Sequence, residues 1–94
     1  MTPLNFAADP APVSWPARVR EYLAAMPVSP FTPAQDLDWM QCAVAGRGYP
    51  SYAAQQRVAA LLRAARDDRG GVALDGQRAL IDAIRDRTGQ VARR

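Results

Sequence analysis

Residues 32–46, TPAQDLDWMQCAVAG, carry the clearest structural signal in this chain. Thr32 at the N-cap, Pro33 at the first helical position and Gln35 at the third are the parts of a capping box. In that motif the Thr and Gln side chains accept hydrogen bonds from backbone N–H groups at the start of a helix. Gly46 suits the left-handed conformation in which many helices end. The stretch therefore predicts a helix that runs from residue 33 to residue 45.

Outward from this helix, the chain shows three further helical patterns. One is predicted between Ser14 and Pro27, one from residue 51 to about residue 68 with Ser51 or Tyr49 as its cap, and one from residue 76 to residue 88 with Gly89 as its terminator. Each places apolar side chains three and four residues apart, which gathers them on one face. The predicted core positions of the four helices are Trp15, Val19, Tyr22, Leu23, Met26, Leu37, Trp39, Met40, Cys42, Ala43, Val44, Ala54, Val58, Leu61, Leu62, Ala65, Leu80, Ile81, Ile84 and Thr88.

These patterns predict an all-α fold, a small bundle of about four short helices. A chain of 94 residues has the size of one domain, and we assign residues 14–89 to it. Residues 1–13 contain three prolines and no helical period, which predicts an extended or disordered N-terminal arm. Residues 90–94 are predicted to form a frayed C-terminal tail.

The set of reactive side chains argues against catalysis. Histidine and lysine are absent, and the acids are eight aspartates and the single Glu21. Histidine is the usual general acid and base near neutral pH, and His and Cys side chains bind most transition metals. Cys42, the one cysteine, lies within a predicted helix and not at the helix N-terminus that would favour a reactive thiolate. We therefore expect a protein that is not an enzyme and has no cofactor or metal ion.

Charge is distributed unevenly along the chain. Residues 1–56 hold three arginines and four acids, whereas residues 57–94 hold nine arginines and five acids, so the two parts carry −1 and +4. All twelve basic residues are arginine. A genome rich in G and C explains this bias together with the 19 alanines, and the alternative explanation is bidentate recognition of phosphate or carboxylate groups. The charge therefore permits nucleic acid or an acidic protein surface as a partner.

The sequence also bears on the compartment. No stretch approaches the roughly 20 apolar residues of a membrane span, and the first residues lack the pattern of a signal peptide. A single cysteine cannot form an internal disulfide, which suits a reducing environment. We therefore expect a soluble, cytoplasmic protein with no membrane partner.

The favoured functional hypothesis is a protein-interaction module that acts as a small adaptor, inhibitor or regulatory subunit. Trp, Tyr and Arg side chains dominate the hot spots of protein interfaces, and several of them lie in or near the turn after residue 45. We predict that these residues bind the partner protein, with core burial as the alternative for the aromatic ones: Trp39, Arg47, Tyr49 and Tyr52. A homodimer is a further option, through small side chains on one side of the next helix: Ala53, Ala60 and Ala64.

The alternative hypothesis is a DNA-binding regulator that uses residues 47–66. A helix at 34–45, a glycine-containing turn and a helix at 51–67 have the order of a helix-turn-helix motif, whose second helix enters the major groove. The side chains predicted to contact base edges are Gln55, Gln56 and Arg57. Those predicted to reach phosphates are Arg47, Arg63 and Arg66. Two helices joined by a glycine turn are common in small helical domains, so this pattern is weaker than the one for a protein partner.

Overall fold

The computed structural model describes residues 14–92 and confirms the all-α bundle. Its four α-helices are α2 (Trp15–Ala25), α3 (Pro33–Ala45), α4 (Tyr52–Leu62) and α5 (Leu74–Ala92), and a short 3-10 helix, η1 (Arg63–Ala65), follows α4 directly. Within residues 14–92 there is no strand, apart from an isolated β-bridge between Arg66 and Val72. The predicted N-terminal arm, residues 1–13, lies outside the described residues.

The capping signals at the start of α3 and α4 are confirmed. The backbone N–H of Gln35 donates to Thr32 Oγ1 at 3.1 Å, and the N–H of Thr32 donates to Gln35 Oε1 at 2.9 Å. Gly46 ends α3 with a φ of 71°, in the left-handed region. At the start of α4, the N–H of Ala54 donates to Ser51 Oγ at 3.1 Å. These boundaries depend on local hydrogen bonds, which explains why they could be predicted.

Helix α4 ends earlier than predicted, at Leu62 instead of near residue 68. After η1 the chain extends at Arg66 and reverses through a tight turn, in which the N–H groups of Arg69 and Gly71 both donate to Asp67 Oδ1, at 2.9 and 3.1 Å. A short side chain that bonds the backbone in this way competes with helical hydrogen bonding. The prediction for this boundary was wrong because it took Asp67 as part of the helix.

Helix α5 is longer than predicted and continues through Gly89 to Ala92. Glycine ends a helix when it adopts the left-handed conformation, but Gly89 has no positive φ and remains helical. A glycine inside a helix costs only about 1 kcal/mol relative to alanine. Residues 90–92 of the predicted frayed tail are therefore helical. Residues 93 and 94 lie outside the described residues.

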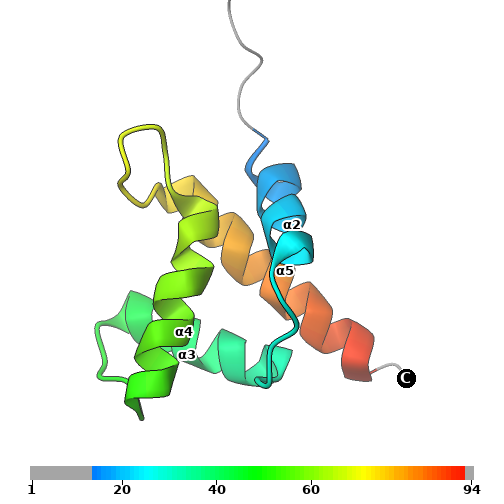
Figure 1. Ribbon diagram of the computed structural model, residues 1–94, viewed down its shortest axis with the longest axis vertical. Coiled ribbons are helices and arrows are strands. Elements are labelled where there is room, and N and C mark those ends of the chain that lie inside the picture. Colours follow the sequence, from blue (N-terminus) through cyan, green and yellow to red (C-terminus); the bar gives the residue numbers. More distant parts are fainter. Residues whose placement is uncertain (1–13, 93–94) are drawn as a thin grey trace, which may run out of the picture.

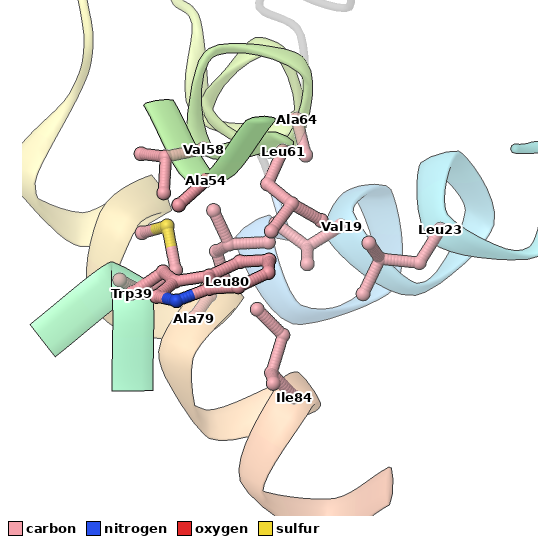
Figure 2. Packing of buried hydrophobic residues seen from close by; sticks show 11 residues of the cluster. Val19, Leu23, Trp39, Ala54, Val58, Leu61, Ala64, Ala79, Leu80 and Ile84 are labelled. Carbon is pink, nitrogen blue, oxygen red and sulfur yellow. The ribbon is translucent and has the colours of Figure 1, made fainter. Parts of the chain in front are cut away.

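The core forms where α5 crosses the molecule, because α5 packs against α2, α3 and η1 (Figure 1). Figure 2 shows Trp39 of α3 and Leu80 of α5 near its centre, between Val58 of α4 and Ile84 of α5. Most of the predicted apolar stripes are buried here, which confirms the helical periods. The buried cluster consists of Val19, Leu23, Trp39, Met40, Ala54, Val58, Leu61, Ala64, Ala79, Leu80 and Ile84.

Gly76 marks a close approach between α5 and its neighbours. A methyl group there would lie 2.8 Å from Cε3 and Cζ3 of Trp15 and 3.0 Å from Cα of Ala65. We predict that Gly76→Ala lowers the free energy of unfolding by up to about 2 kcal/mol, because overpacking costs about 1–3 kcal/mol and the gain in helix propensity offsets only about 1 kcal/mol of it.

Gly89→Ala is the matched control, because a methyl group there meets nothing within 4 Å. It is expected to leave stability unchanged or raise it by up to about 1 kcal/mol. Urea unfolding followed by circular dichroism compares the two variants. Equal stability of the two would contradict the close packing at Gly76.

Candidate interaction surfaces

A buried ion pair joins α3 to α4. Arg57 Nε and Nη2 donate to Asp36 Oδ1 and Oδ2, both at 2.9 Å, and the two side chains are only 13% and 8% exposed. The contact is bidentate, the geometry in which guanidinium and carboxylate groups interact most strongly. Arg57 was predicted to contact base edges, but in the structure its guanidinium is turned inward against Asp36. Asp36 also places a negative charge in the first turn of α3, where it is favourable.

With Arg57 turned inward, the outward face of α4 is made of other residues. Exposed side chains recur at intervals of three and four along the helix, opposite to its buried stripe, and they are Tyr52, Gln55, Gln56, Ala59 and Arg63. Gln55, Gln56 and Arg63, three of the residues predicted for nucleic acid, therefore share one face. Arg47 and Arg66, before and after this helix, are also exposed.

The four residues predicted to bind a partner protein do not form one surface. Trp39 is 8% exposed and packs edge-on against Phe31, with ring centroids 4.9 Å apart. Tyr49 is half-buried against the core. Arg47 and Tyr52 are exposed, Tyr52 by 72%. The alternative for Trp39, burial in the core, is the one that the structure supports.

The three alanines predicted to form a dimer face are also separated. Ala53 is exposed, Ala60 is half-buried and Ala64 is only 3% exposed. The Tyr22 hydroxyl of α2 donates to the carbonyl oxygen of Ala60 at 3.2 Å, so this position of α4 is already in contact within the chain. Ala64 lies in η1, beyond the end of α4, and belongs to the core. The three alanines therefore do not share one exposed surface.

An apolar hollow between α3 and α5 was not predicted. Its lining comes from the end of α3 and the first two turns of α5, and consists of Val44, Leu74, Gln77, Arg78 and Ile81. Val44 was expected in the core but is 54% exposed, and Leu74 is 77% exposed. The sequence held a partial signal, because Leu74 and Ile81 lie seven residues apart and thus on one side of a helix. The contribution of α3 depends on the tertiary fold.

A second groove follows the seam between α2 and α5, and charges of both signs line it. Arg20 of α2 faces the α5 residues Asp82, Asp86 and Arg87 there. Asp82 also accepts a hydrogen bond from Arg85 at 3.3 Å, in an ion pair that is more than half exposed. Exposed pairs of this kind contribute little free energy. The two arginines and two aspartates balance, so this groove offers a ligand no net charge.

Among residues 14–89, no three His, Cys, Asp or Glu side chains come together in a group that could hold a metal ion. The Cys42 thiol is free and half-buried. No helix in the described part of the chain combines the length and the apolar character that a bilayer span requires.

Comparison of the chain with protein-family models, with curated proteins and with solved structures finds no match in any of the three.

Proposed function

We propose that this chain is a non-enzymatic protein-interaction module, a small adaptor, inhibitor or regulatory subunit, and that it binds its partner protein through the apolar hollow between α3 and α5. The observation that carries the proposal is the exposure of Leu74 and Val44 beside Ile81. Large apolar side chains that meet at a hollow are typical of interaction sites, whereas single exposed ones are common on any surface.

The physical basis is the apolar area that a partner would remove from water. Full burial of a leucine or valine side chain contributes about 1.5–3 kcal/mol, and Leu74 and Val44 are each more than half exposed in the free chain. Gln77 and Arg78 line the same hollow and supply hydrogen-bond donors at its edge. An apolar centre with a polar rim is the usual anatomy of a protein interface.

Leu74→Glu is expected to reduce capture of the partner protein. The immobilised chain is incubated with an extract of cells that encode it, and retained proteins are quantified by mass spectrometry. If Leu74 is an interface hot spot worth 2 kcal/mol or more, its loss lowers affinity at least about 30-fold. The variant should remain folded, because an exposed substitution changes stability by only about 0.5 kcal/mol.

Val28→Glu is the matched control. Val28 is fully exposed, at 101%, and lies between α2 and α3, outside the hollow. Its substitution places the same charge on the surface at a different position and should leave capture unchanged. A protein that the wild-type chain and both variants retain equally does not bind the hollow. The proposal would be wrong if every specifically retained protein were retained equally by all three.

A further inference from the structure

The outward face of α4 carries positive charge and hydrogen-bonding groups but no acid. Between Asp38 and Asp67 the chain has four arginines and no aspartate or glutamate. The guanidinium of Arg57 is neutralised by Asp36. The remaining three, Arg47, Arg63 and Arg66, are exposed. This part of the chain therefore has an uncompensated charge of +3 in a protein whose net charge is also +3.

Hydrogen bonds near the end of α4 hold the Asp67 carboxylate within its own turn and bring a further arginine, Arg18, beside Arg66. The Asp67 carboxylate, the first acid after the helix, accepts hydrogen bonds from Arg69 and Gly71 within its own turn. Arg18 of α2 donates to the carbonyl oxygen of Arg66 at 3.1 Å and stacks over Trp15 at 4.9 Å from the ring centroid. A further cation is thus held beside Arg66, while the Arg66 side chain itself remains exposed.

The polar groups of this face can bond to the edge of a base pair. Gln55 and Gln56 lie on the exposed side of α4, and the Gln56 amide nitrogen donates to the Tyr52 hydroxyl. The amide of glutamine can donate and accept, as the major-groove edge of adenine requires. From Tyr52 to Arg63 the face is about 16 Å long, and a major groove about 12 Å wide admits a helix.

We propose that this face is a binding site for double-stranded DNA, in which Arg47, Arg63 and Arg66 contact phosphates and the two glutamines face the bases. The positive charge of the three arginines complements the negative charge of the phosphate backbone. The proposed DNA site shares no residue with the apolar hollow. It therefore does not depend on the partner protein proposed above.

The salt dependence of binding tests this proposal. Binding of a fluorescent 20-base-pair duplex of mixed sequence is measured by anisotropy between 50 and 200 mM salt. Each neutralised phosphate contributes a slope of about −0.9 to the plot of log affinity against log salt concentration, so three contacts predict a slope near −2.7 and an affinity loss of about 40-fold over this range. A slope steeper than −2 is the expected result, and no binding at 50 mM salt would overturn the proposal.

Single variants then locate the site. Arg47→Gln, Arg63→Gln and Arg66→Gln should each lower affinity about tenfold at 50 mM salt and make the slope shallower by about 0.9. Arg85→Gln is the control, because Arg85 is an exposed arginine in the half of α5 that runs away from α4 (Figure 1). Its removal lowers the net charge equally but should change the slope by less than 0.3. Equal effects of all four variants would show that only net charge attracts DNA and would overturn the site.

Polyglutamate with the same number of charges distinguishes duplex DNA from an acidic protein. The proposal expects it to bind at least tenfold more weakly than the duplex at 50 mM salt. Tighter binding of polyglutamate, with the same loss in Arg63→Gln, would assign the face to an acidic protein and contradict the proposal. Circular dichroism of each variant confirms that the helices are intact, as expected for exposed substitutions.

Discussion

Arg57→Ala is expected to lower the free energy of unfolding by about 3–5 kcal/mol, because it leaves the Asp36 carboxylate buried without its partner. Asp36 is only 8% exposed as a side chain, and both its oxygens accept hydrogen bonds from Arg57. Domains of this size have total stabilities of roughly 5–14 kcal/mol, so the variant should lose a large part of its stability. Urea unfolding followed by circular dichroism measures the loss.

Two further variants separate the ion pair from other effects of the substitution. Arg63→Ala removes an exposed arginine just after α4 and should change stability by no more than about 0.5 kcal/mol. Asp36→Leu combined with Arg57→Met replaces both charges by apolar groups and should recover most of the loss, because apolar replacements of buried ion pairs are often neutral or stabilising. If Arg57→Ala were no more destabilising than Arg63→Ala, the buried ion pair would have no structural role.

Leu80→Ala is expected to lower the free energy of unfolding by about 2–5 kcal/mol, the range for removing a buried leucine and leaving a cavity. Leu80 is fully buried where α5 crosses the core, beside Trp39 (Figure 2). A domain of this size shifts its melting temperature by about 4–8 °C for each kcal/mol, so thermal unfolding should also show the effect clearly.

Leu74→Ala on the same helix is the matched control. The substitution removes the same atoms, but Leu74 is 77% exposed, so the expected change in stability is within about 0.5 kcal/mol. The comparison isolates burial from helix propensity and residue type. Similar losses in the two variants would contradict the packing of α5 and also the exposure on which the proposed protein interface depends.

The parts of the fold that were predicted correctly depend on local interactions. The capping box of Thr32 and Gln35, the cap at Ser51 and the glycine at the end of α3 each involve residues three or four positions apart. The apolar period of α2 likewise placed Val19 and Leu23 in the core. Such signals can be read without knowing what packs against the helix.

The errors are of two kinds. Some concern contacts between segments that are distant in the sequence, and others concern residues that can adopt either a helical or a turn conformation. Asp36 and Arg57 are 21 positions apart, so nothing in either helix alone indicates that they meet. Asp67 fits a helix by composition, but its carboxylate closes a turn instead. Gly89 was expected to end α5, whereas the helix continues past it. In each case tertiary structure or an alternative hydrogen bond decided the outcome.

For the candidate surfaces too, local features could be predicted from the sequence and contacts between distant segments could not. The exposed side chains of α4, among them Gln55, Gln56 and Arg63, follow from its helical period. The hollow between α3 and α5 requires Val44 and Leu74 to meet across the fold, and a sequence pattern cannot show that. Burial of Arg57 also changed the composition of the α4 face, because it removed the arginine closest to the two glutamines.

The central claim is that the chain acts through two separate contact surfaces. The most direct test measures the binding of both ligands, partner protein and duplex DNA, to each of two variants. Leu74→Glu and Arg63→Gln are each assayed for retention of the captured partner protein and for binding to duplex DNA at 50 mM salt. We predict that Leu74→Glu loses the protein and keeps DNA affinity within about threefold, and that Arg63→Gln does the reverse. Loss of both ligands in either variant, or of neither in both, would contradict two separate surfaces.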